Sequence, residues 1–318
     1  MKGSIVIPCY NVEKYIVGML DSLFKDENIN EWLVILIDDG STDQTYKILC
    51  EYKKNNVNLI KQENKGQSKS RNIGLEYSEG EFIIFLDADD IVSENYISNL
   101  YNVAQESNCD MVVGNIYSLD VDGNIDKYNS RNYLVDDFKT LEGCNSETIS
   151  KFLQDRLSVS PCNKLIRKSI LSEPPFLCGY INEDMLFAFD LFYKKINIKR
   201  CEKATYYYVS REGSTTKRND ARILDMYHVL NEIKKSDTND YISSIDWAYY
   251  YVKFGVILTL NRSRKSCNTI KLKIIKQILN DLENQKFKDL YKSCESIKQK
   301  IVIIVLKSLS KMKSLIFR

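Results

Sequence analysis

Three aspartates stand within four positions, directly after an apolar run. The run occupies residues 82–86 (FIIFL), and its β-branched and aromatic side chains predict a strand that is buried on both faces. Asp87 and Asp89 are two positions apart, so they face the same way in extended backbone. Two such carboxylates at a strand end suit a hard divalent cation, which could hold phosphate oxygens. The alternative is a polar turn that caps the next helix, with Ser93 as the N-cap.

A second pair of carboxylates, Asp38 and Asp39, ends the apolar run at residues 33–37. Adjacent residues of a strand point to opposite faces, so at most one of the two faces a ligand directly. A carboxylate at this place can accept hydrogen bonds from the N–H of a base or from ribose hydroxyls. The alternative is a helix N-terminal turn in which Asp38, Ser41 and Asp43 act as caps. The pattern alone leaves both interpretations open.

Other candidate side chains lie further along the chain. Arg71 could donate to a base or a phosphate, although a surface ion pair is a common role for a single arginine. Asp184 could take a proton from an acceptor hydroxyl. On spacing alone, Glu183 and Asp184 are better explained as favourable charges at a helix N-terminus. Arg211 and Ser214 could clamp a diphosphate, although a solvated basic loop is the simpler interpretation.

Several kinds of site are excluded. No G-x-x-x-x-G-K-[ST] occurs, and no G-x-G-x-x-G follows the first strand, which argues against a P-loop enzyme and an ordinary dinucleotide fold. The single histidine, His228, nearly excludes a histidine-based zinc site or catalytic triad, and we expect it to be structural. Nine scattered cysteines and no signal peptide before the first strand predict reduced thiols in a cytosolic protein. No nucleic-acid partner is expected.

Hydrophobic periodicity predicts the elements that position these side chains. Strands are expected at residues 5–7, 33–37, 57–60 and 82–86, with helices at about 12–24, at about 44–54 and through 71–75. Such alternation is the signature of a doubly wound, mostly parallel, Rossmann-like α/β sheet. Its topology would collect the polar strand ends at one edge, where ligands bind. Later elements are expected as helices at about 93–107, 135–160 and after 183, and as strands at 110–114 and 204–209.

Charge divides the chain near residue 220. Residues 221–318 contain 19 Lys and Arg against 9 Asp and Glu, whereas residues 1–220 contain 26 against 34. We therefore predict one domain over residues 1–220, which contains all of the candidate site residues, and a helical, Lys-rich region over 221–318. Within that region the apolar run 301–306 is too short to span a bilayer. It fits either a basic amphipathic helix on an anionic membrane surface or a helix packed on the body or on another subunit.

As an ordered set, the motifs resemble glycosyltransferase family 2, which has the GT-A nucleotide-sugar fold. The matching segments are residues 4–13 (SIVIPCYNVE), 37–43 (IDDGSTD), 64–68 (NKGQS) with 71–75 (RNIGL), and 85–90 (FLDADD). A thinner match continues through residues 163–165 and 183–184 to Tyr208 and Ser214. Residues beyond about 220 add nothing to the resemblance. Cys162 departs from the pattern, because many relatives carry a tryptophan there.

The resemblance implies roles for the candidate residues. The nucleotide pocket would be shaped by Pro8, Tyr10, Asn11 and Glu13 and completed by Asn64, Gly66 and Arg71. Asp39 would contact the base, usually uracil, and Asp87 would reach the ribose. Asp89 would ligate Mn²⁺ or Mg²⁺ at the diphosphate, over which Arg211 and Ser214 would close. Asp184 would be the catalytic base, with Glu183 as an acceptor-side or orienting residue.

The resemblance also implies an activity. We expect a metal-dependent, inverting glycosyltransferase that moves a sugar from a UDP-linked donor to a glycan or lipid-linked glycan in surface polysaccharide synthesis. Its expected location is cytoplasmic, with the basic tail as a candidate contact to the inner membrane face. One alternative is a sugar nucleotidyltransferase, but the Gly-rich phosphate loop of that class is missing after the first strand. The other is a non-catalytic nucleotide-sugar-binding subunit, which the presence of Asp184 disfavours.

Overall fold

The computed structural model describes residues 1–119, 123–125, 139–209, 221–264, 266–283 and 285–311. It divides into two compact units. The first, here called the sheet unit, comprises residues 1–148, 156–179 and 183–211. The second, the helical unit, comprises residues 149–155, 180–182 and 212–318. The domain boundary predicted after residue 220 falls at the end of a stretch, 210–220, that is outside the described residues.

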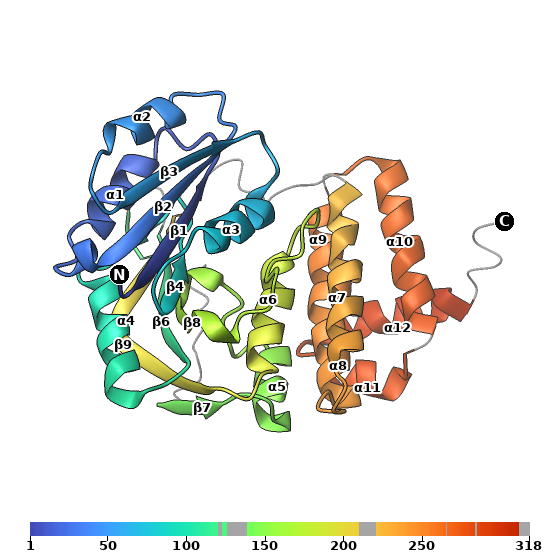
Figure 1. Cartoon of the computed structure of the whole chain (residues 1–318). Coiled ribbons are helices and arrows are strands. Elements are labelled where there is room, and N and C mark those ends of the chain that lie inside the picture. Colours follow the sequence, from blue (N-terminus) through green and yellow to red (C-terminus); the bar gives the residue numbers. More distant parts are fainter. Residues whose placement is uncertain (120–122, 126–138, 210–220, 265, 284, 312–318) are drawn as a thin grey trace. The chain divides into compact units, whose positions relative to one another are not determined.

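The sheet unit alternates strands and helices through its first half (Figure 1). Its strands are β1 (Gly3–Cys9), β2 (Trp32–Asp39), β3 (Val57–Gln62), β4 (Phe82–Phe85), β5 (Ile91–Val92), β6 (Met111–Leu119), β7 (Thr140–Glu142), β8 (Lys164–Arg167) and β9 (Asn197–Val209). Its helices are α1 (Ile16–Leu23), α2 (Thr45–Glu51), α3 (Gln67–Glu76), α4 (Tyr96–Ser107) and α6 (Glu183–Phe192), and α5 (Ser146–Leu153) continues into the helical unit.

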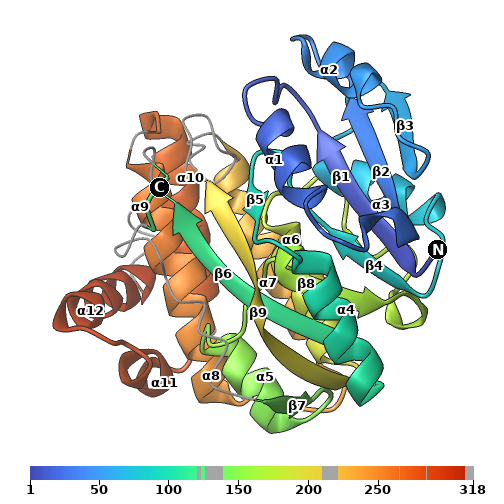
Figure 2. The same cartoon turned by 90° about the vertical axis from the view of Figure 1, so that its left-hand side faces the viewer.

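The strands form one sheet in the order β3-β2-β1-β4-β8-β6-β9-β5, with β7 paired to β9. The first four are parallel, as the alternating pattern predicts. β8 runs antiparallel to both β4 and β6, whereas β6 and β9 run side by side in parallel (Figure 2). The predicted α/β fold is confirmed. The mostly parallel arrangement holds for the first half of the sheet only, and the second half is mixed.

Two predicted helices differ from the structure. A helix is expected over residues 135–160, of which 135–138 lie outside the described residues. Within 139–160 it is α5 alone, because the chain before α5 forms β7 and then turns at Cys144 with φ +57°. The helix expected from residue 93 begins at Tyr96, so Ser93 is not its N-cap. Ser93 instead pairs with Thr205 of β9, with N–H to carbonyl oxygen at 2.9 Å and Oγ accepting at 3.0 Å. The capping interpretation of the aspartate cluster is therefore wrong in this respect.

Side chains cover both faces of the parallel strands, which explains their continuous apolar sequences. One face packs against α1 and α4, through residues that include Ile5, Val34 and Ile84. On the other face, α3 approaches so closely that a Cβ added at Gly74 would lie 2.2 Å from Val6 Cγ1. Contacts of this kind fix the position of α3, which carries Arg71.

The helical unit confirms the helical pattern expected beyond residue 221. It contains α7 (Asp225–Ser236), α8 (Ser244–Tyr250), a π-helical segment (Tyr251–Leu258), α9 (Thr259–Ser263), α10 (Asn268–Glu283), α11 (Phe287–Lys292) and α12 (Ile297–Lys311). His228 of α7 stacks on Tyr180, with ring centroids 4.0 Å apart. Within the described ranges, no helix is long and apolar enough to cross a membrane. All nine cysteines lie in the described ranges, and each is a free thiol.

The contact between α3 and β1 predicts opposite effects of the same substitution at two helical glycines. Gly74→Ala should lower the free energy of unfolding by about 1–3 kcal/mol, because the new methyl group overpacks Val6. Gly18→Ala, in α1 with no atom near the added Cβ, should raise it by about 0.5–1 kcal/mol through helix propensity. Urea denaturation measures both values. Equal effects of the two substitutions would contradict the packing of α3.

Candidate active site

The loops after β1 and β2 are joined to each other by hydrogen bonds. The Asn11 N–H donates to Ser41 Oγ (3.1 Å), and Asn11 Oδ1 accepts from the Thr42 N–H (2.8 Å). Glu13 Oε2 accepts from the Gln44 N–H (2.9 Å). Asn11 has φ +51°, a left-handed conformation that asparagine tolerates well. The structure therefore uses Asn11 and Glu13 to shape these loops, in keeping with the pocket-shaping role that the resemblance implies.

Tyr10 and Pro8 lie beside these paired loops. The Tyr10 side chain is 46% exposed, and Pro8 is half-buried near the end of β1. An exposed aromatic ring at such a loop can stack on a nucleotide base. Tyr10 is thus an exposed aromatic residue of the first motif that a ligand could reach.

Asp39 organises the loop between β3 and α3. Its Oδ1 accepts from Gln62 Nε2 (2.6 Å) and from the Lys65 N–H (2.8 Å), and its Oδ2 accepts from the Gly66 N–H (2.8 Å). Gly66 has φ +86°, a conformation that favours glycine, and Asn64 beside it is exposed. Asp39 is 3% exposed, and its hydrogen bonds hold the loop that leads into α3. Its contact with a base, which the resemblance implies, stays a prediction.

Asp38 points to the other face of β2, as strand alternation predicts. It is fully buried, and neither carboxylate oxygen has a hydrogen-bond partner among the described residues. Burial raises the pKa of the neighbouring Cys9 thiol, and the carboxylates of Asp38 and Asp89 raise it further. A buried carboxylate without a donor is costly, so this edge of the sheet would be stabilised by a cation.

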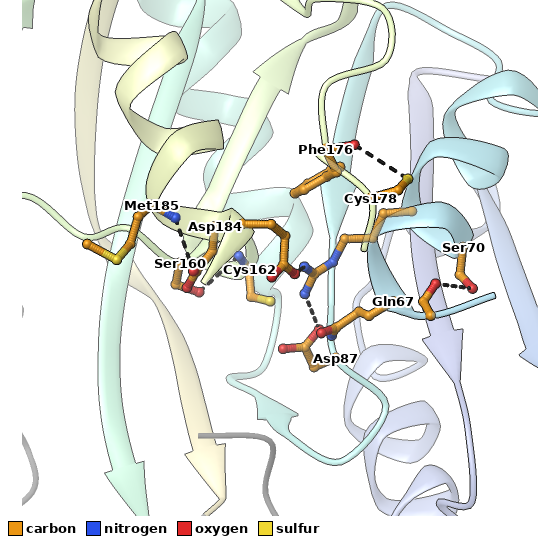
Figure 3. Close-up of polar contacts among 12 residues, drawn as sticks. Gln67, Ser70, Asp87, Ser160, Cys162, Phe176, Cys178, Asp184 and Met185 are labelled. Atoms are coloured by element: carbon orange, nitrogen blue, oxygen red, sulfur yellow. Dashed lines mark hydrogen bonds and ion pairs between the residues drawn. The ribbon is translucent and has the colours of Figure 1, made fainter. Parts of the chain in front are cut away.

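The residues of the aspartate cluster alternate in exposure. Asp87 and Asp89 are half-exposed, whereas Ala88 and Asp90 are buried. The extended backbone predicted for the cluster is wrong, however, because β4 ends at Phe85 and residues 87–90 form a turn in which the Asp90 N–H donates to the Asp87 carbonyl oxygen (3.3 Å). Asp87 Oδ1 accepts from Gln67 Nε2 at 2.8 Å (Figure 3). Gln67 belongs to the NKGQS segment, but sequence reasoning gave it no role.

Asp90 has a role that its sequence position does not disclose. It accepts hydrogen bonds from the Tyr206 hydroxyl and from the Val209 N–H (2.8 Å), both on β9. Burial raises the pKa of Asp90 well above its usual range, and Asp89 and Asp87 raise it further. A buried carboxyl with these partners ties the cluster to the end of β9. Residues 210–220, including Arg211 and Ser214, follow that end and lie outside the described residues.

Arg71 connects the aspartate cluster to the acidic pair at the start of α6. Its Nη2 lies 2.6 Å from Asp87 Oδ1, and its Nη1 lies 3.3 Å from Glu183 Oε1. The guanidinium also sits over the Phe176 ring, 5.1 Å from its centroid. Burial alone would lower the pKa of Arg71, but Asp87 and Glu183 outweigh burial and raise it. The side chain is only 3% exposed, so the surface ion-pair interpretation is wrong.

The two carboxylates of the acidic pair have different surroundings. Burial raises the pKa of Glu183 to about 7; Asp184 adds to the increase, and Arg71 opposes it. Burial also raises the pKa of Asp184, again against the effect of Arg71. Asp184 Oδ1 accepts from the Met185 N–H at 3.0 Å, and the residue is half-exposed (Figure 3). Glu183 is thus held by Arg71, while Asp184 can be reached from solvent.

The Asn-Lys-Leu segment has an internal role. Lys164 is fully buried, and its Nζ donates to the carbonyl oxygens of Ser158 (2.8 Å) and Ser160 (2.5 Å). Burial lowers the pKa of Lys164 to about 7. Asn163 is also buried and donates to the Gly114 carbonyl oxygen (2.9 Å). Cys162 is 1% exposed, so its side chain does not line an open acceptor surface.

The residues at this edge fit a divalent cation only with help from a ligand. Among the described residues, no group of three or more His, Cys, Asp and Glu side chains is arranged to hold a metal ion. Asp87 is already bound by Arg71 and Gln67, and Asp89 is the half-exposed carboxylate to which the resemblance assigns the metal. Mg²⁺ commonly binds through one or two carboxylates together with phosphate oxygens. A diphosphate would therefore have to supply the remaining ligands.

A mixed α/β sheet with acidic strand ends, joined through a buried arginine to a second acidic pair, defines a GT-A type protein. Residues 4–173 match the profile of glycosyl transferase family 2, and the chain belongs to that family. Its sequence is 34% identical over 220 residues to the glycosyltransferase GlyG of Streptococcus pneumoniae, which covers 66% of this chain and 71% of GlyG.

Another relative is the poly(ribitol-phosphate) beta-N-acetylglucosaminyltransferase TarS of Staphylococcus aureus. It is 31% identical over 247 residues, which cover 73% of this chain but only 40% of TarS. The crystal structure of TarS residues 1–349 in complex with UDP-GlcNAc superimposes with a TM-score of 0.71 at 22% identity, covering 94% of this chain and 88% of that one. At this identity the structural likeness establishes the fold.

The bridge made by Arg71 predicts that substitution of this arginine lowers stability in a pH-dependent way. Arg71→Met should lower the free energy of unfolding by about 3–5 kcal/mol at about pH 8.5, because two carboxylates lose their counter-ion. Glu183 has a pKa of about 7, above its ordinary 4.5, so its proton stabilises the folded state at low pH and is lost as the pH rises through about 7. At about pH 6 Glu183 is largely protonated and carries no unpaired charge. Arg71→Met should therefore lower the free energy of unfolding by less at about pH 6 than at about pH 8.5.

Urea denaturation at the two pH values measures this effect. The matched variant, Arg71→Met/Glu183→Gln, should recover much of the lost stability at high pH, because one of the unpaired charges is gone. Equal losses at both pH values, or a double variant as unstable as the single one, would contradict the bridge.

Proposed function

We propose that this chain is an inverting glycosyltransferase that uses a UDP-linked sugar and a divalent cation to extend a surface glycan. The observation that carries the proposal is the bridge from Asp87 through Arg71 to Glu183. It brings the carboxylates suited to a metal–diphosphate group close to a carboxylate suited to base catalysis. Transfer from a nucleotide sugar needs both groups in one site.

The donor end of the site uses the strand-end loops. Tyr10 would stack on the base, Asp39 would accept from it, and Asp87 would lie toward the ribose. Asn64 and Gly66 would complete the pocket, and Arg211 and Ser214 would close over the diphosphate. UDP is favoured as the nucleotide because TarS, which shares this fold, has been crystallised with UDP-GlcNAc and with UDP.

A divalent cation, Mn²⁺ or Mg²⁺, would be held by Asp89 together with diphosphate oxygens. Bound there, it would stabilise the charge that develops on the departing nucleoside diphosphate. The unpartnered, buried Asp38 carboxylate nearby supports the idea that this edge of the sheet favours positive charge.

The acceptor end of the site uses the acidic pair. Asp184 would accept the proton of the acceptor hydroxyl as that oxygen attacks the anomeric carbon from the face opposite the leaving group. Its raised pKa makes it a better proton acceptor than an ordinary aspartate. Glu183, held by Arg71, would orient the acceptor or Asp184 itself. One base without a second carboxylate nucleophile implies inversion of the anomeric centre.

A glycan or lipid-linked glycan of the cell surface is the acceptor class that the relatives favour. One matching protein is a poly(ribitol-phosphate) beta-glucosyltransferase of Bacillus spizizenii, and TarS also acts on poly(ribitol-phosphate). Family membership argues against the alternative of a sugar nucleotidyltransferase. A non-catalytic binding subunit would share the fold and the donor pocket, so it has to be separated by a test of turnover.

Nucleotide specificity can be tested by thermal shift with UDP-, GDP- and TDP-sugars, each with and without Mn²⁺. A ligand at about 100 times its Kd stabilises the native state by about 2.7 kcal/mol, which corresponds to several degrees in Tm. UDP-sugars should give the largest shift, and Mn²⁺ should increase it. Asp89→Asn should remove the Mn²⁺-dependent part of the shift. A larger shift with GDP- or TDP-sugars would contradict the proposed donor.

The base assignment predicts a separation of turnover from binding. Asp184→Asn should lower kcat by about 10²–10⁴-fold, because an amide cannot take up the acceptor proton. The Kd for UDP, measured by calorimetry, should stay within about twofold of the wild-type value, since Asp184 is not expected to contact the nucleotide.

Asp190→Asn is the matched control, because Asp190 lies on the same helix and its ion pair with Lys194 is exposed. It should leave kcat nearly unchanged. Full activity of the Asp184 variant would contradict the base assignment, and inactivity of the wild type with every UDP-sugar that binds would favour the non-catalytic subunit.

A further inference from the structure

The helix α12 exposes an apolar stripe that no described residue covers. The stripe consists of Ile297, Ile301, Ile304 and Val305, which are 76%, 56%, 43% and 50% exposed. At 100° per residue these positions fall within one third of the helix circumference. Large aliphatic side chains gathered on one face in this way mark an interaction surface more often than scattered single residues do.

The opposite face of α12 is packed, so the stripe cannot simply turn inward. Ile303, Leu306 and Ser310 are buried, and α12 lies against α10 and α11 (Figure 1). Lys307 fixes this orientation, because its Nζ donates to the carbonyl oxygens of Leu282 and Gln285 (2.6 Å for Gln285) at the end of α10. The helical unit therefore holds the apolar stripe outward.

The surroundings of the stripe are basic. α12 contains four lysines and no acidic residue. Lys298 and Lys311 are exposed on either side of the stripe, and Lys300 reaches over the Tyr291 ring, 5.1 Å from its centroid. Tyr291 and Phe287 of α11 are themselves 39% and 42% exposed. Aliphatic residues flanked by lysines and exposed aromatic rings are the pattern of a helix that lies in a membrane interface.

We propose that α12 docks the protein on an anionic lipid surface, with the stripe inserted at the headgroup boundary. The 15 residues of α12 are too few to cross a bilayer, so the helix would lie in the plane of the interface. The lysines would contact acidic headgroups, to which a polybasic helix is attracted. A second copy of the chain is a poorer occupant, because a two-fold contact through the stripe would bring two rims of lysines together.

Vesicle co-sedimentation of the full chain tests this docking. Vesicles of phosphatidylcholine with about 30% phosphatidylglycerol should bind it, vesicles of phosphatidylcholine alone should bind it much more weakly, and added salt should weaken the binding. Ile297→Ser/Ile301→Ser/Val305→Ser should lower the partition coefficient by about tenfold or more, through lost insertion. The substituted side chains are exposed, so the thermal melting of the variant should match that of the wild type.

Val17→Ser/Tyr77→Ser/Ile245→Ser is the control, because it removes three exposed apolar side chains that are not part of α12. It should bind vesicles like the wild type. Failure of the wild type to bind anionic vesicles, or equal binding by the stripe variant, would overturn the proposal. So would conversion of a dimer to a monomer by the stripe substitutions with vesicle binding retained. Donor binding in the thermal-shift assay reports on the proposed transferase separately, and it should be the same in all three proteins.

Discussion

The buried guanidinium of Arg71 holds the candidate site together. Arg71 comes from α3, Asp87 follows β4, and Glu183 begins α6, so one guanidinium links three elements of the sheet unit. Burying a charge is costly unless it is paired, and the planar guanidinium can serve two carboxylates at once. Lysine has neither this shape nor this reach. The close packing of Gly74 against Val6 matters because it sets the position from which Arg71 extends.

The same interaction gives neighbouring carboxylates different partners and different exposure to solvent. Glu183 pairs with Arg71, and Asp184 next to it stays half-exposed with a raised pKa. In the aspartate cluster, Asp87 is bound by Arg71 and Asp90 is buried against Tyr206, whereas Asp89 is half-exposed. Similar side chains thus acquire different tasks, because burial and hydrogen bonding differ from one position to the next.

Hydrophobic periodicity in the sequence predicted the features that depend on short stretches of chain. The four parallel strands follow from apolar runs between helical patterns, and the opposite orientations of Asp38 and Asp39 in β2 follow from strand alternation. The turn at residues 87–90 was expected only as the alternative interpretation, because the metal-site interpretation assumed extended backbone there. The bridge from Arg71 to Glu183 spans 112 positions of sequence, and no periodicity reports a contact of that kind. Likewise, Tyr206 is one of three consecutive tyrosines, and only the pairing of β9 beside the cluster singles it out. The antiparallel pairing of β8 with β4 and β6 also depends on contacts between segments far apart in the sequence.

The central claim is that one site holds both the diphosphate and the acceptor's base. A crystal structure of the chain with an unreactive UDP-sugar analogue and Mn²⁺ tests it most directly. We expect the diphosphate and cation at Asp89, with the Asp184 carboxylate on the face of the anomeric carbon opposite the leaving oxygen and the Arg71 bridge intact. A diphosphate bound away from Asp89, or Asp184 on the leaving-group face, would contradict it.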